Sequence, residues 1–306
     1  MADFLNLPVG GRPAGLAGAY TAVAEGADAM AYNLAGLASV DRAEVTFAQS
    51  NYIEKISQQW GALALPIHRI GTFGVGVNYL GIGGIDGYDA SGTPTNNVSS
   101  HDLALNVGYG RTILNLDSLG LLSLDGGLAV KYIEERLDTV QGDTLAADFG
   151  LMARPAAAKW FKFGMSFENL GGSMRFINEE NALPLKIKLG GSAQGDWRGL
   201  KGLLDIETIK DCNGGQSMAL GVEGTVLRAL ALRFGYETHR DMGQGINFGA
   251  GFQMDRLIPD LPGLRIDYAY AGYANFGNTH RFGLTFAFGP QGGWRAPGGV
   301  PGVKKP

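Results

Sequence analysis

Apolar residues alternate with small or polar ones, at a period of two, along most of this 306-residue chain. One such run reads Leu264, Arg265, Ile266, Asp267, Tyr268, Ala269 and Tyr270. Successive side chains of a β-strand point to opposite faces, so this pattern predicts strands with one apolar and one polar face. The fold class we expect is therefore all-β.

Fourteen runs of this kind lie between residues 43 and 288. Their predicted bounds are 43–50, 56–65, 70–80, 101–111, 122–136, 143–154, 159–169, 183–194, 200–208, 216–225, 229–237, 245–256, 263–272 and 279–288. A strand and its connection together take about 18 residues. Soluble sandwiches repeat every ~8–12 residues, whereas strands of ~9–11 residues suit a tilted crossing of a bilayer.

The less apolar face of these strands carries charges of both signs in equal number. Ten of them form a predicted charge network: Lys186, Lys188, Asp205, Glu207, Glu223, Arg233, Glu237, Arg265, Asp267 and Arg281. An enclosed lumen favours balanced charges, because an unpaired charge away from bulk water is costly. Outer-membrane barrels turn apolar residues to lipid and polar residues inward. We therefore predict a 14-stranded antiparallel transmembrane β-barrel. A soluble two-sheet sandwich is the alternative fold, and a substrate path is the alternative role of the charges.

Glycine is abundant, at 49 of 306 residues or about 16%, against a usual share of roughly 7%. Glycines let strands curve and leave room for a plug inside a barrel. The division we expect is a plug at 1–42, the barrel at 43–288 and a Gly/Pro-rich periplasmic tail at 289–306. The tail lacks periodicity, which predicts an extended or disordered segment.

Catalytic, metal and nucleic-acid motifs are absent from the sequence. Lys304-Lys305 is its one cluster of basic residues, which argues against nucleic acid as a partner. No nucleophile elbow, zinc-protease motif or P-loop occurs, so we expect no enzyme activity and no cofactor. The four histidines, at 68, 101, 239 and 280, lack metal-ligand spacing, and Cys212 has no second cysteine to pair with.

Connection lengths predict which rim of the barrel faces the cell exterior. With both barrel ends in the periplasm, even-to-odd connections average about five residues and the others about nine. Outer-membrane barrels have short periplasmic turns and longer outer loops. The two longest, 81–100 and 170–182, fall on the predicted outside. They are candidates for contacts outside the cell, or simply variable surface loops.

The N-terminal segment resembles a known family. The runs Phe4-Leu5-Asn6-Leu7-Pro8-Val9-Gly10-Gly11-Arg12 and Ala27-Asp28-Ala29-Met30-Ala31-Tyr32-Asn33-Leu34-Ala35-Gly36-Leu37 look like the N-terminal signature of the PorV/PorQ family. The segments Tyr268-Ala269-Tyr270 and Asn278-Thr279-His280-Arg281-Phe282 look like its C-terminal end. That family is similar to the FadL fatty-acid transporters, which have fourteen strands around an N-terminal hatch. Leu34 stands where the family usually has proline, so we expect a less rigid turn at that point of the hatch.

The resemblance implies a bacterial outer-membrane location, with the signal peptide removed, and three roles. We expect a partner or shuttle for exported proteins in type IX-like secretion, because the more specific match is to PorV/PorQ. The alternatives are a FadL-like channel for lipophilic small molecules such as fatty acids, and a structural or adhesive barrel. The hatch should contain short helices near 13–24 and 27–32. Its predicted ligand pocket comprises Leu16, Tyr20, Asn33, Leu34 and Leu37.

Overall fold

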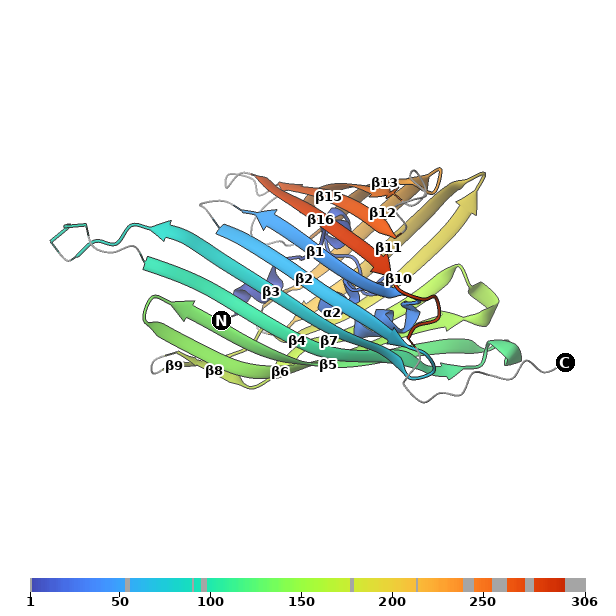
Figure 1. Cartoon of the computed structure of the whole chain (residues 1–306), viewed down its shortest axis with the longest axis horizontal. Helices are drawn as coiled ribbons and strands as arrows, with labels where there is room; N and C mark the ends of the chain where they lie inside the picture. The colour runs from blue at the N-terminus through green and yellow to red at the C-terminus, as the bar shows by residue number, and fades with distance from the viewer. Residues whose placement is uncertain are drawn as a thin grey trace.

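The computed structural model describes residues 2–52, 56–89, 91–94, 98–176, 179–212, 214–238, 245–254, 263–272 and 278–294. Within these residues, fourteen antiparallel strands close into one barrel (Figure 1). The barrel strands are β1 Ala43–Asn51, β2 Ile56–Ile67, β3 Gly71–Ile85, β4 Val98–Asn115, β5 Leu122–Leu137, β6 Val140–Pro155, β7 Phe161–Gly171, β10 Lys186–Trp197, β11 Leu200–Asp211, β12 Gln216–Val226, β13 Leu230–Glu237, β14 Ile246–Gln253, β15 Leu264–Gly272 and β16 Asn278–Phe288. Closure comes from β1, which pairs with β16 from Ala43↔Phe288 to Asn51↔His280.

Each predicted strand corresponds to one barrel strand, so the fourteen-stranded prediction is confirmed. The predicted loop 170–182 contains an additional small hairpin, formed by β8 Ser173–Phe176 and β9 Glu179–Ala182. Turns as short as residues 198–199, between β10 and β11, connect even to odd barrel strands all around the barrel, because the β8–β9 hairpin adds two to the numbering and leaves its parity unchanged. We call the rim that carries Ala43 and Phe288 the periplasmic rim, and the opposite one the outer rim.

Large apolar side chains are exposed on the outer face of the barrel. Examples are Val107 of β4 at 63%, Leu145 of β6 at 61% and Phe282 of β16 at 57% exposure. A water-facing surface of this kind would be unfavourable, whereas lipid accommodates it. This surface and the closed barrel are those of a protein of the bacterial outer membrane. None of the helices in the described ranges is long and apolar enough to cross a membrane.

The N-terminal segment enters the barrel and fills its middle as a hatch (Figure 1). Its elements are η1 Asp3–Asn6, α1 Gly11–Gly15, α2 Ala29–Tyr32 and η2 Leu34–Ser39. The predicted helix at 13–24 was wrong beyond residue 15, because Ala17 and Gly18 adopt left-handed φ values of 54° and 78°. A residue in this conformation ends an α-helix. Residues 16–23 therefore form turns rather than a helix.

Glycines of the inner wall allow the hatch backbone to approach the strands closely. A Cβ at Gly127 of β5 would lie 2.4 Å from the Leu34 carbonyl oxygen, and one at Gly235 of β13 would lie 2.3 Å from the Ala17 nitrogen. No side chain fits at such distances. The glycine excess of the sequence thus reflects, at these positions, contact between wall and hatch.

The first part of the predicted tail is hydrogen-bonded to the barrel and includes an isolated parallel β-bridge between Ile67 and Trp294. The backbone N–H of Trp294 donates to the Pro66 carbonyl at 2.9 Å, and the His68 N–H donates to the Trp294 carbonyl at 2.8 Å. The N–H of Gly292 donates to the Asp41 carboxylate at 2.7 Å. Residues 289–294 therefore bind the periplasmic rim beside β2 and the end of the hatch. The rest of the predicted tail lies outside the described residues.

Candidate functional site

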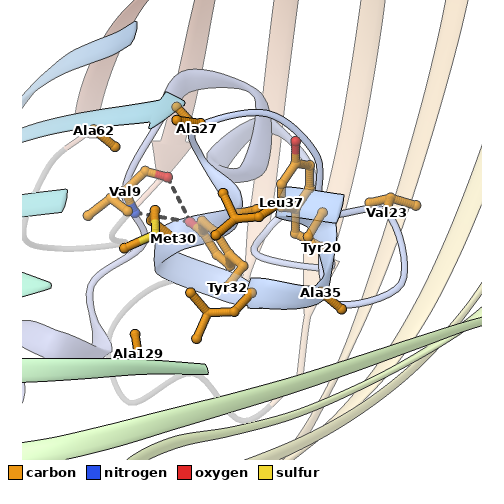
Figure 2. Packing of buried hydrophobic residues seen from close by; sticks show 14 of the residues in the cluster. Val9, Tyr20, Val23, Ala27, Met30, Tyr32, Ala35, Leu37, Ala62 and Ala129 are labelled. Atoms are coloured by element: carbon orange, nitrogen blue, oxygen red, sulfur yellow. Dashed lines mark hydrogen bonds between the residues drawn. The ribbon is translucent and has the colours of Figure 1, made fainter. Parts of the chain in front are cut away.

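The centre of the hatch is a close-packed apolar cluster. Leu16, Tyr20 and Leu37 are each fully buried, and Leu34 is 3% exposed. The rings of Tyr20 and Tyr32 pack edge to face with centroids 5.2 Å apart (Figure 2). The Tyr32 hydroxyl donates to the Val9 carbonyl at 2.7 Å and accepts from the Val9 N–H at 3.0 Å. The structure thus brings these four predicted pocket residues into one hatch core.

Asn33, the fifth predicted pocket residue, joins the hatch to the wall. Its Nδ2 donates to the carbonyl oxygens of Thr21 at 2.8 Å and Leu151 at 3.0 Å, and its Oδ1 accepts from the Ala35 N–H at 3.1 Å. The last bond caps η2, and Leu34 occupies the first position of that helix. Proline is therefore not needed to start this turn, because the asparagine cap defines it.

A chain of alternating charges connects the hatch to β12, β13 and β15. Arg12 of α1 contacts Glu25 at 2.5 Å and Glu223 at 2.8 Å. Glu223 also accepts from Arg233 at 2.6 Å, so one carboxylate binds two guanidinium groups. The chain continues from Arg233 to Asp267, also at 2.6 Å.

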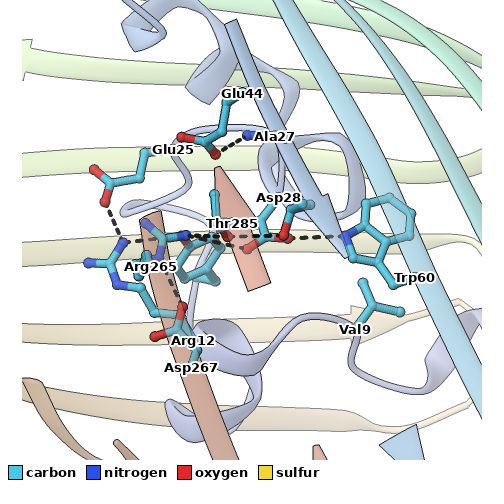
Figure 3. Close-up of polar contacts among 12 residues, drawn as sticks. Val9, Arg12, Glu25, Ala27, Asp28, Glu44, Trp60, Arg265, Asp267 and Thr285 are labelled. Carbon is cyan, nitrogen blue, oxygen red and sulfur yellow. Dashed lines mark hydrogen bonds and ion pairs between the residues drawn. The ribbon is translucent and has the colours of Figure 1, made fainter. Parts of the chain in front are cut away.

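The same chain returns from the wall to the hatch. Arg265 contacts Asp267 at 2.9 Å and lies 3.8 Å from Asp28 (Figure 3). The other Asp28 oxygen accepts from the indole N–H of Trp60 at 3.0 Å. Burial raises the pKa of Asp28 to about 6; Arg265 and the Trp60 bond oppose this rise, and Glu44 reinforces it. Hatch and wall thus share one set of buried ion pairs.

The remaining predicted charges lie elsewhere in the lumen. Lys188 contacts Glu168 at 2.9 Å. Glu207 Oε2 accepts from the backbone N–H groups of Tyr20 at 3.0 Å and Thr21 at 2.8 Å, which ties the hatch to β11. Arg281 donates to the Tyr52 hydroxyl at 2.7 Å, and Glu237 accepts from the Ser217 hydroxyl at 3.2 Å. The other two predicted charges are Lys186 and Asp205: Lys186 lines a small outer cavity, and Asp205 is fully buried beside Glu207 on the same face of β11.

Sequence reasoning missed the hatch members of the ionic chain, namely Arg12, Glu25 and Asp28, and the wall residue Trp60. Strand alternation predicts the charges of the wall, but the hatch has no such alternation. Arg12 and Asp28 both lie within the N-terminal signature, and a charged residue in an otherwise small and apolar segment is the signal that could have identified them.

Two cavities lie on opposite sides of the hatch. The larger, about 530 Å³, opens near the periplasmic rim, and its described lining includes six cations and three anions. The cations Lys159, Lys201 and Arg228 are exposed there. The smaller, about 80 Å³, lies toward the outer rim beside Asn6, Tyr32 and Lys186. Neither is lined by Leu16, Tyr20 or Leu37, so the predicted ligand pocket around these residues stays a prediction.

A third cavity, of about 420 Å³, is an apolar depression in the lipid-facing wall over β4 to β7. Its floor is formed at Gly126 and Gly127, and Leu128, Phe149 and Phe167 are part of its sides. We call it the wall depression. In the described ranges, no three histidine, cysteine or acidic side chains are grouped so that they could hold a metal ion.

Comparisons with known proteins identify the same architecture elsewhere. No family model and no curated protein matches the sequence. The structure is similar to the Ralstonia pickettii toluene transporter TbuX, with a TM-score of 0.61 and 12% identity, covering 92% of this chain and 98% of that chain. It is also similar to the Pseudomonas putida toluene transporter TodX, with a TM-score of 0.58 and 11% identity over 90% and 99% of the two chains.

A Pseudomonas aeruginosa FadL homologue gives a TM-score of 0.55 and 12% identity over 92% of this chain and 99% of that one. At these identities the shared feature is the fold. The chain therefore has the fold of FadL-type outer-membrane transporters over nearly its whole length.

Proposed function

We propose that this barrel is an outer-membrane channel for lipophilic small molecules. The observation that carries the proposal is the apolar hatch core between two cavities, in a barrel with the fold of hydrocarbon transporters. An apolar core is a barrier to ions and water, because polar groups lose hydration there. A lipophilic molecule loses no polar hydration in such a core, so it can pass once the hatch is displaced. This was the alternative expected from the sequence, and the comparisons favour it.

The protein-partner role of the PorV/PorQ type is the second candidate. It is favoured by β3 and β4, whose paired ends extend past the neighbouring strands at the outer rim (Figure 1). Beyond them, Tyr88 forms a bridge to Pro94 and is 62% exposed. Exposed aromatic residues on projecting hairpins are suited to protein contacts. None of the structural similarities above concerns a secretion protein.

The channel proposal can be tested by measuring uptake in a variant whose hatch is linked to the wall by a reversible disulfide. A Cβ at Gly190 would lie 3.3 Å from the Ala22 Cβ, near the separation that a disulfide spans. The variant Ala22→Cys/Gly190→Cys, with the exposed Cys212→Ser, should therefore fix the hatch to β10 when oxidised. We would express it in a host without its own fatty-acid channel and measure uptake of radiolabelled oleate and toluene.

We expect uptake in the reduced state, loss on oxidation and recovery with dithiothreitol; each single-cysteine variant should be insensitive to redox state. Absence of uptake in the wild type and the reduced variant would contradict the channel. Co-purification of a stoichiometric protein partner in mild detergent, together with that absence, would instead support the secretion role.

A further inference from the structure

The wall depression combines three features at one place on the lipid-facing surface. Its sides are apolar, its floor lacks an outward side chain at Gly126, and Arg111 of β4 lies at its edge. A Cβ at Gly126 would lie 2.2 Å from the Ile113 Cδ1 and 3.4 Å from the Leu151 Cδ2. The glycine therefore leaves room for the Ile113 side chain to lie across the floor beside Leu151.

A local irregularity of the strands contributes to this shape. The register of β4 against β5 shifts between Thr112 and Leu114, so Ile113 is an additional residue in β4. A bulge of this type bends the strand and re-aims its side chains. The shape of the depression therefore depends on the β4 backbone, through the bulge at Ile113.

Arg111 is unusual for its position. Among the described outward-facing residues of β4 to β7, it is the one cation in the periplasmic half of the wall. Its side chain is exposed, and its one hydrogen bond within the described residues goes to the adjacent Thr112 carbonyl at 3.4 Å. An outward arginine in a transmembrane barrel is unfavourable at the bilayer centre but tolerated near the interface, where its long stem reaches the headgroups. A guanidinium there matches a phosphate group in charge and geometry.

We propose that the wall depression binds one phospholipid of the periplasmic leaflet, with an acyl chain against Leu128, Phe149 and Phe167 and the phosphate at Arg111. The volume of about 420 Å³ accommodates much of one acyl chain, and the single cation at its edge complements one phosphate. The site adjoins the hatch contact, because Leu151 lines the depression and its carbonyl accepts from Asn33. A bound lipid therefore supports the wall segment that holds the hatch.

Native mass spectrometry of the barrel in detergent tests this site. The probes are dimyristoyl phosphatidylglycerol and the phosphate-free dimyristoylglycerol. Arg111→Gln removes the phosphate contact, and Gly126→Leu fills the depression. The matched controls are Arg136→Gln, an exposed arginine at the other end of β5, and Gly61→Leu, an outward glycine of β2 whose Cβ would meet one atom, at 4.0 Å.

We expect one phosphatidylglycerol adduct in the wild type and the controls, and about tenfold weaker binding in Arg111→Gln and Gly126→Leu. Dimyristoylglycerol should bind weakly, with no dependence on Arg111. Equal affinity of all five proteins for phosphatidylglycerol, or equal affinity of the wild type for both lipids, would overturn the proposal. Heat-dependent electrophoretic mobility reports folding. Arg111→Gln remains decisive if Gly126→Leu does not fold, since the exposed arginine has no buried contact to lose.

Discussion

The hatch is bound to two sides of the barrel by different chemistry. Toward β3 to β7 it packs by shape: Met30, Leu34 and Leu37 lie against wall glycines such as Gly127. Toward β12 to β15 it is bound by ion pairs, in the chain that begins at Arg12. Wall glycines approach the hatch on the second side as well, as at Gly235 of β13, but there the chain of buried ion pairs is added to the packing.

This difference suggests how the hatch could move. Packing against glycine is short-ranged and does not respond to pH or salt. Buried ion pairs are sensitive to loss of either partner, because the remaining charge is left uncompensated. The ionic side also borders the larger cavity, which is lined by Arg12, Glu223 and Arg233. We expect the ionic side to be the one that releases the hatch.

The largest effect should come from Glu223→Gln. The substitution leaves Arg12 and Arg233 without their shared carboxylate, and breaking a buried pair in this way costs about 3–5 kcal/mol. Urea titration should show this loss in the free energy of unfolding, and hydrogen exchange should increase in residues 10–25. The control Asp196→Asn changes an exposed carboxylate of the same cavity and should have little effect. An unchanged exchange rate in Glu223→Gln would mean that the ion pairs do not retain the hatch.

A smaller effect is expected from pH through Asp28, which connects the ionic side to Trp60. Its pKa is raised in the folded protein, so between about pH 4 and pH 6 the folded state binds more protons than the unfolded state. The contribution of Asp28 to the free energy of unfolding is therefore largest at low pH, and it is lost as the pH rises through about 6. The rise from 3.8 to about 6 corresponds to about 3 kcal/mol. Asp28→Asn should remove this part of the pH dependence; the same slope in both proteins would assign it to other groups.

The smallest effect should be on the glycine side, from Gly127→Ala. The new methyl group meets the Leu34 carbonyl, so hatch or strand must shift, at a cost of about 1–3 kcal/mol. Gly202→Ala in β11 is the control, because a Cβ there meets no atom within 4 Å. Thermal or urea denaturation would measure both. If Gly127→Ala lowered the free energy of unfolding as much as Glu223→Gln does, the two sides would hold the hatch equally strongly, contrary to our expectation.

Much of the barrel could be predicted from local pattern. The alternation at 264–270 already separates Ile266, which is exposed to lipid, from Asp267, which is buried in the lumen. It also identified Glu223, Arg233 and Arg265 as inward-facing. Strand bounds mostly agreed within a few residues, because side-chain alternation begins and ends close to where each strand does.

The contacts of the hatch could not be predicted in the same way. Arg12 and Glu223 are separated by 211 residues, and their contact depends on the register of every strand between them. Helices as short as α1, with five residues, have too little intrinsic stability to be read from propensity. The β8–β9 hairpin and the wall depression were missed too, since the depression needs Ile113 to be placed beside Gly126 by a bulge.

The sequence by itself therefore determined the number of strands, the inward and outward faces, and the presence of a small-residue segment able to fit inside. The tertiary structure alone decided which wall residues that segment meets, and which of these contacts are made by close packing and which by charge. The physical reason is that alternation is a local property of two adjacent peptide units, whereas a contact across the lumen exists only after the barrel has closed.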